Sequence, residues 1–377
     1  MPVEVRERDP IAEIDKRASH CTSGLAHASI RANRSARLRA KLRVWAGFLI
    51  AIGGRTLSSC KIKPATTVSE QIALLKQRGM QVNDMIAEQW LPIVGYYRLS
   101  GYWYPARIVN ATSTARTDRF QPGVTFDDVI RLYEADRKLR TLVYDGMERI
   151  EIAMRALITD LLSLTPTNNP QVYLQSERFR QNFNHTEWLW TIYGRLNRAS
   201  NRSASIKHYK NNYGGQFPLW IIAESMDFSD VSKLYSGLPS ADQFKIAERL
   251  GISIDLGALN RNQKEKVFRK HPWANWLEQL TIIRNTCAHH GRLWNQSFLP
   301  ASTVAMRTNH KFSLLPEEQS ERIFGALVVM SSIIRVVSPG TTWPNKVLKL
   351  INTDFLSNPL VEGASIGMPP SQETLVL

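Results

Sequence analysis

The chain has 377 residues, of which 43% are hydrophobic and 21% charged, and these proportions are typical of a globular protein that buries a substantial core. It carries 48 Lys and Arg against 33 Asp and Glu, a formal net charge of +15, which favours a polyanionic partner unless the basic surface has no function. Its three cysteines are too few for a disulfide framework, and no apolar run approaches the roughly 18 residues of a membrane-spanning helix, so we expect a cytoplasmic protein without membrane attachment.

Residues 1–60 differ from the rest, since they are rich in Arg, Ala and Ser and show no sustained periodicity. We expect a poorly ordered, basic N-terminal extension. The apolar stretch 44–54 follows an arginine-rich run, but it lies too far from Met1 to be typical of a secretory signal. We therefore divide the chain into this extension, one helical domain over 61–345 and a C-terminal tail over 346–377.

Two short helices are predicted at the start of the domain. Thr67 or Ser69 is suited to cap the first, and Gly79 to end it. Asn83 or Asp84 is suited to cap the second, which we expect Pro92 to interrupt.

A dense aromatic segment, YYRLSGYWYPAR, follows over residues 96–107. Interleaved aromatic and basic side chains, such as Tyr97, Arg98 and Arg107, can stack on bases and hold phosphates. Large rings also pack protein cores, and this is the more common use of such a cluster. Residues 110–123 are predicted to be a polar connection.

The longest periodic segment spans residues 126–164. Its apolar side chains recur at multiples of three or four residues, and acidic and basic residues four apart support an exposed face, which predicts one long helix. Further helices are predicted from 217, over 241–250 and 321–338, and in the segment HPWANWLEQLTIIRNTCAHHGRLWN, with a loop at 197–205. Strand patterns are rare, so the fold class is all-α.

The stretch RNTCAHHGRLWN, residues 284–295, holds the densest polar chemistry. Gly291 is suited to the position just after a helix end, which places Arg284 and His289 near the tip of a helix. Asn285 and His289 are four residues apart and share a face, whereas Arg284 and His289 point about 140° apart around the helix axis.

Three chemistries compete for this stretch. Cys287, His289 and His290 could bind a metal ion, but a structural zinc site needs four ligands in spaced pairs. Cys287 could be a nucleophile paired with His290, but no acid is near to orient the histidine. Metal-free RNA cleavage needs a guanidinium for the phosphate and an imidazole to move a proton. A structural role at the helix terminus is the remaining alternative.

Six ordered stretches resemble the abortive-infection proteins of the AbiD/AbiF-like family, which belong to the HEPN ribonuclease superfamily. They lie within about residues 63–340, and their residues are IALLKQRGM, YYRLSGYWYP, LYEADRKLR, MERIEIAMRA, LWIIAESMDFSDVSKLY and RNTCAHHGRLWN. The last contains the RNxxxH signature of HEPN nucleases. The pair Met226-Asp227 departs from the expected pattern, where a plainer apolar and small sequence is typical.

The resemblance implies a HEPN-like helical bundle with additional helices, and a metal-independent endoribonuclease without a cofactor, used in phage defence. Arg284 would stabilise the phosphate, His289 would be the general acid or base, and Asn285 would orient the scissile group. HEPN sites are composite, and only one RNxxxH occurs here, so a homodimer is implied. An antitoxin or a non-coding RNA is a further possible partner. The residues expected to contact RNA are His290, Arg292, Trp294, Arg98, Tyr97 and Arg107.

Two other functions stay open at this point. One is a non-catalytic RNA-binding or interaction protein on the same fold, since folds are reused after activity is lost. The other is a membrane-associated protein that uses the basic extension and the apolar stretch 44–52.

Overall fold

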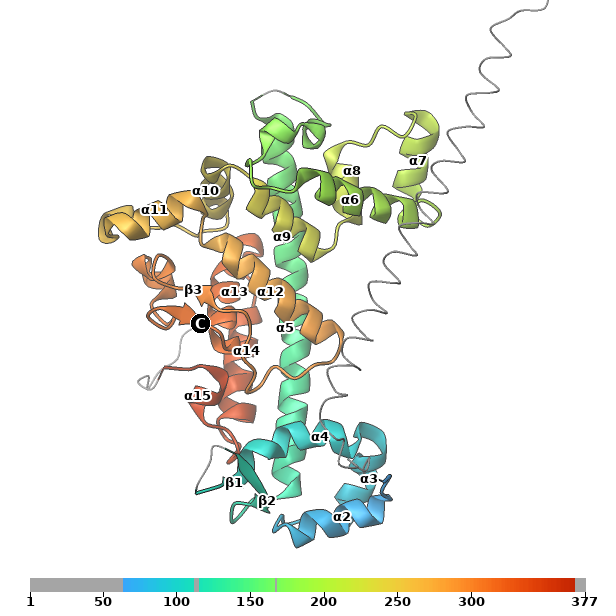
Figure 1. Ribbon diagram of the computed structural model, residues 1–377, viewed down its shortest axis with the longest axis vertical. Helices are drawn as coiled ribbons and strands as arrows, with labels where there is room; N and C mark the ends of the chain where they lie inside the picture. Colours follow the sequence, from blue (N-terminus) through green and yellow to red (C-terminus); the bar gives the residue numbers. More distant parts are fainter. Residues whose placement is uncertain (1–63, 112–114, 167, 370–377) are drawn as a thin grey trace, which may run out of the picture. The chain divides into compact units, whose positions relative to one another are not determined.

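The computed structural model describes residues 64–111, 115–166 and 168–369, and these are mostly helical, which confirms the predicted class (Figure 1). The chain divides into the units Met1–Thr66 and Thr67–Leu377, and every helix and strand named below belongs to the second. The predicted N-terminal extension over 1–60 lies outside the described residues. No described helix is both long and apolar enough to span a bilayer.

The domain begins with α2 (Val68–Gln77), α3 (Asp84–Val94) and α4 (Tyr96–Trp103). Thr67 and Asn83 cap the first two helices, as predicted, because each side chain accepts backbone N–H groups that have no partner within the helix. The sequence predicts that Pro92 interrupts this helix, but the structure shows Pro92 inside α3. It lies within the last turn, and the helix ends two residues later, with Gly95 as its C-cap.

A hairpin follows, formed by β1 (Arg107–Val109) and the antiparallel β2 (Arg116–Phe120). The prediction of a continuous polar connection over 110–123 is therefore wrong for residues 116–120. Their alternation is too short and too polar to be recognised as a strand without its partner.

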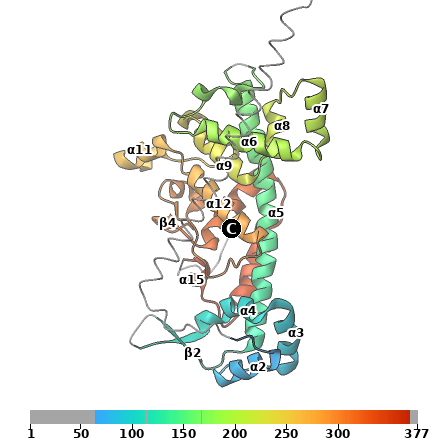
Figure 2. The ribbon, with the colours of Figure 1, turned by 45° about the vertical axis from the view of Figure 1, so that its right-hand side comes forward.

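The 39-residue helix α5 (Phe126–Leu164) is the scaffold of the domain, as its periodicity predicts. Thr125 caps it by accepting the backbone N–H of Asp128. Helices α12 (Trp273–Ala288), α13 (Ile323–Val337) and α14 (Trp343–Leu350) pack along it, and both views show it running through the length of the helical part (Figures 1 and 2).

Helices α6 (His185–Ala199) and α7 (Ala204–Asn212) replace most of the predicted loop over 197–205, of which only residues 200–203 lie between helices. Ser203 caps α7. A serine-rich sequence is typical of a loop, because serine side chains compete for backbone hydrogen bonds. Here Ser203 uses that ability as the N-cap of α7.

The unusual pair Met226-Asp227 marks the break between α8 (Leu219–Ser225) and α9 (Phe228–Gly237). Asp227 caps α9 and accepts the backbone N–H groups of Ser229 and Asp230, so it has a defined local role.

The remaining elements complete the core and its rim. In chain order they are α10 (Ser240–Arg249), α11 (Arg261–Arg269), α12 (Trp273–Ala288), β3 (Ala301–Ser302), β4 (Gln319–Ser320), α13 (Ile323–Val337), α14 (Trp343–Leu350), the π-helix Ile351–Phe355 and α15 (Gly363–Ile366). Short 3-10 helices occur at Tyr104–Ala106, Val172–Leu174, Ser176–Arg178, Leu256–Ala258, Met306–Thr308 and His310–Phe312.

The segment expected to be a C-terminal tail begins inside α14, and its apolar residues Val347, Ile351 and Phe355 are buried. The described part of this segment, residues 346–369, thus belongs to the packed domain. The apolar residues of this segment lie partly on an α-helix and partly on a π-helix, whose turns differ in length. They therefore do not show the 3.6-residue repeat by which a helix is recognised in a sequence.

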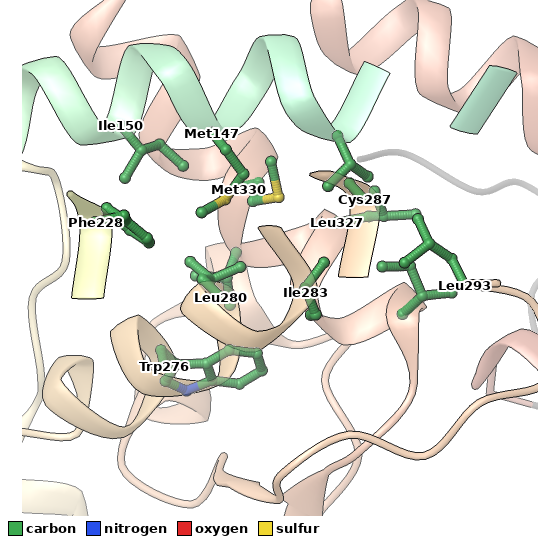
Figure 3. Packing of buried hydrophobic residues seen from close by; sticks show 14 of the residues in the cluster. Met147, Ile150, Phe228, Trp276, Leu280, Ile283, Cys287, Leu293, Leu327 and Met330 are labelled. Atoms are coloured by element: carbon green, nitrogen blue, oxygen red, sulfur yellow. The ribbon is translucent and has the colours of Figure 1, made fainter. Parts of the chain in front are cut away.

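The core lies between α5, α9, α12 and α13 (Figure 3). Side chains from all four helices meet there and are almost completely buried, among them Met147, Ile150, Phe228, Leu280 and Met330. Such burial contributes about 1.5–3 kcal/mol per large apolar side chain. This packing places one side of α12 firmly inside the domain.

Candidate functional site

Helix α12 divides the candidate motif between core and surface. Trp276, Leu280, Ile283 and Cys287 point into the core (Figure 3). The polar motif residues lie outside the core: Arg284 is half-buried at the flank of the core-facing side, and Asn285 and His289 are exposed. The motif is thus the accessible edge of a helix whose inner face is held by packing.

The helix ends in a Schellman motif, in which the Gly291 N–H donates to the Thr286 carbonyl and the His290 N–H to the Cys287 carbonyl. His290 has a φ of 57°, and so it occupies the left-handed position that glycine usually takes. The sequence prediction assigned that position to Gly291 and is wrong by one residue.

Gly291 has a different reason to be glycine. A Cβ on this residue would lie 2.7 Å from Thr286 Cγ2 and 3.2 Å from the Thr286 carbonyl oxygen. The close return of the chain over the last helical turn leaves no room for a side chain.

A buried carboxylate holds the segment that follows. Asp136 of α5 accepts the backbone N–H groups of Leu293 (3.1 Å) and Trp294 (2.8 Å) and the hydroxyl of Tyr102 (2.8 Å), and it pairs with Arg140. Burial raises the pKa of Asp136, and these four partners oppose that rise because each favours the charged form. The tip of α12 is therefore attached to the middle of the scaffold helix.

Arg284 borders a pocket of about 230 Å³ that it shares with Tyr144, Glu148, Glu151 and Arg155. Its guanidinium lies 5.6 Å from the centre of the Tyr144 ring, and one of its N–H groups donates to Asn285 Oδ1 at 3.4 Å. Burial raises the pKa of Glu151, and the positive charges of Arg155 and Arg284 oppose this. Within its own chain, Arg284 thus faces acidic neighbours.

A larger groove, of about 700 Å³, opens on the other side of Tyr144. His290 lines it together with three arginines, Arg98, Arg137 and Arg140. The Arg98 guanidinium donates to the His290 carbonyl at 2.7 Å, so α4 and the end of α12 are in direct contact.

The residues predicted to contact RNA have different positions. Tyr97 is 91% exposed, beside Arg98. Arg292 is half-buried and lies over the rings of Tyr102 and Trp294. Arg107, in the hairpin, pairs with an aspartate and does not line the groove.

Trp294, which was predicted to contact RNA, is instead buried in the core. It is 1% exposed, it stacks on Tyr102, and its indole N–H donates to Ser365 Oγ at 2.9 Å. A buried ring with a satisfied N–H group has no free face for a base.

The competing chemistries fit the geometry less well. Cys287 is buried, which raises the pKa of its thiol to about 12, and a thiol of this kind is a poor nucleophile at neutral pH. Among the described residues, no three His, Cys, Asp or Glu side chains gather where they could hold a metal ion.

Two site residues escaped the sequence prediction, Arg137 and Tyr144. Together with Tyr133 and Thr141 they recur every three or four residues and form one stripe of α5 along the groove. The spacing was visible, but arginines on a long helix usually belong to a solvated face, and nothing local separates the two cases.

The model of the family of Abi-like proteins matches residues 89–295, more than half of the chain. The match begins within α3 and ends with the segment that follows α12, so it contains both the groove and the RNxxxH stretch. No curated protein and no solved structure matches the chain.

Proposed function

The chain belongs to the family of Abi-like proteins, and from this membership we propose that it is an effector of abortive infection, a phage defence, that cleaves single-stranded RNA without a metal ion. The observation that carries the proposal is the placement of Arg284, Asn285 and His289 on the accessible edge of a helix whose other side is locked in the core.

The proposed reaction needs only these side chains and the RNA itself. The 2′-hydroxyl loses its proton and attacks the adjacent phosphorus, and the bond from phosphorus to the 5′-oxygen breaks as that oxygen gains a proton. A 2′,3′-cyclic phosphate and a 5′-hydroxyl result. An imidazole such as that of His289 can move these protons near neutral pH, and the Arg284 fork can stabilise the charge on the phosphorane. Asn285 would orient the scissile group.

The proposed site is completed by a second copy of the chain. Arg284 and His289 point about 140° apart on one helix, so one copy cannot readily surround a phosphate. Glu148 and Glu151 beside Arg284 also weaken its attraction for an anion. In a homodimer, each phosphate would meet an arginine of one copy and a histidine of the other.

The direct test is cleavage of single-stranded RNA by the purified full chain in the presence of EDTA. We expect Arg284→Ala and His289→Ala to lower the rate by a factor on the order of 100 or more while the fold stays intact. Arg284→Lys should also fail, because an ammonium cannot reproduce the two-pronged contact with phosphate.

Matched controls are His310→Ala and Arg261→Ala, which remove exposed side chains of the same types elsewhere in the domain. Loss of thermal stability in step with loss of activity would favour a purely structural role at the helix end. If His290→Ala proved to be the inactive variant, the assignment of the histidine would be off by one.

A non-catalytic RNA-binding protein is the second candidate, and the groove lined by arginines favours it. It predicts tight RNA binding without cleavage under any condition. Membrane association is a third candidate, and it predicts sedimentation with anionic liposomes that deletion of residues 1–60 abolishes.

A further inference from the structure

We infer that the groove lined by Arg98, Arg137, Tyr144 and His290, below called the arginine groove, binds one strand of RNA, with a base stacked on Tyr144. The inference rests on the proposed function for the place of cleavage, but strand binding can be measured without cleavage. Residues of α3, α4, α5 and the end of α12 form its walls.

Tyr144 connects the two hollows of this face. The residue is 45% exposed, and it lines both the arginine groove and the pocket of Arg284. The Arg284 guanidinium lies over one face of the Tyr144 ring. A base stacked on the opposite face would have its neighbouring phosphate close to the candidate catalytic arginine. Stacking on an aromatic ring tolerates any base, because every base has a π-face.

Two of the groove's arginines are exposed and can reach phosphates. Arg98 is exposed and uses one of its five N–H donors on the His290 carbonyl. Arg137 is exposed, and its Nε and Nη2 pair with the Glu134 carboxylate, so a phosphate must compete with this solvent-exposed ion pair.

Arg140 has another task in the groove. Its side chain is buried against Asp136, and together they hold the segment after α12. It supplies positive charge to the wall, but its guanidinium is committed. We therefore leave it out of the phosphate contacts.

The groove's size and chemistry favour a single strand. Its volume of about 700 Å³ lies in the range of about 300–1,000 Å³ that is typical of ligand sites. A base reaches the Tyr144 ring only when it is not stacked and paired in a duplex.

The experiment measures binding of a fluorescein-labelled single-stranded RNA of about 20 nucleotides to the full chain carrying His289→Ala, which prevents cleavage. In this background, Tyr144→Ala should weaken binding about tenfold, and Tyr144→Trp should restore it. A duplex of the same sequence should bind more weakly than the single strand.

The salt dependence tests the arginines separately. Each phosphate contact that is lost should flatten the slope of log K against log salt by about 0.7 for a single strand. We expect this change for Arg98→Ala and for Arg137→Ala, and an unchanged slope for Arg261→Ala, which removes an exposed arginine of α11.

The matched aromatic control is Trp190→Ala, since Trp190 is 78% exposed on α6 and does not line the groove. Equal losses for Trp190→Ala and Tyr144→Ala would overturn the inference, as would unchanged binding in all the groove variants. A change in the molecular mass by light scattering, without a change in RNA affinity, would instead assign the groove to contact with a second copy.

These outcomes separate the two proposals. If no RNA is cleaved but binding depends on Tyr144 and the two arginines, the result supports RNA binding in the arginine groove and contradicts the proposed nuclease activity. If RNA is cleaved and the groove variants bind and cleave RNA as well as the unchanged chain does, the result supports the nuclease activity and contradicts RNA binding in the arginine groove.

Discussion

At the scale of single residues, His290 is the most informative position, because it holds a backbone conformation that side chains rarely adopt. The conformation follows from the Schellman motif that ends α12. It also sets the histidine at the wall of the arginine groove, with its carbonyl fixed by Arg98. A non-glycine residue at positive φ costs about 1–2 kcal/mol, and such strain often persists at functional positions.

We expect His290→Gly to stabilise the domain by about 1 kcal/mol, since glycine adopts this conformation without strain. Gly291→Ala should destabilise it by about 1–3 kcal/mol, because the new methyl group would overlap Thr286. Urea unfolding of both variants measures these differences. An unchanged free energy of unfolding for His290→Gly would show that the position carries no strain.

At the scale of elements, the start of α12 depends on a buried histidine. His271 is completely buried, its ring Nδ1 accepts the backbone N–H of Trp273 at 3.2 Å, and its backbone N–H donates to Gln243 Oε1 at 2.9 Å. Burial lowers the pKa of His271 to about 4, because the charged form is poorly solvated inside the protein. The helix that presents the motif is thus sensitive to acid at its base.

The pH dependence follows from this shift. Above about pH 6.5, His271 is neutral in both the folded and the unfolded chain, and its titration has no effect. As the pH falls towards about 4, the unfolded chain binds a proton that the folded chain does not, so stability is lost by up to about 3 kcal/mol.

His271→Asn should remove this loss, because an amide oxygen can still accept the Trp273 N–H but does not titrate. Unfolding free energies of both proteins between pH 7 and pH 4 give the difference. If the two curves stay parallel, His271 does not govern the acid response.

At the scale of the whole molecule, α5 joins the parts of the candidate site. It contributes Tyr144 and two carboxylates to the Arg284 pocket, Arg137 to the groove, and Asp136 to the segment after α12. A single rigid helix can therefore hold both hollows in register. The proposed composite site adds a second copy of this arrangement.

Mixing two inactive variants tests the composite site. A heterodimer of Arg284→Ala and His289→Ala chains, isolated with two different tags, keeps one arginine and one histidine on separate copies. We expect it to recover part of the cleavage activity that both homodimers lack. Failure to recover any activity, or a strictly monomeric protein, would contradict a site shared between copies.

Much of the local structure could be predicted from the sequence, because its causes are short-range. The apolar period marked α5, α12 and α13, and polar residues ahead of an apolar run marked the caps Thr67 and Asn83. The hairpin was missed because a strand is defined by its partner.

The site was predictable only in part, for the same reason. Spacing and capping act within a few residues, so the placement of an arginine, an asparagine and two histidines at the end of a helix follows from local sequence. The burial of Trp294 against Tyr102, the contact of Arg98 with His290 across 192 positions and the position of Tyr144 between the groove and the Arg284 pocket depend on long-range packing. These contacts form when distant segments pack together, so they cannot be predicted from a local sequence pattern.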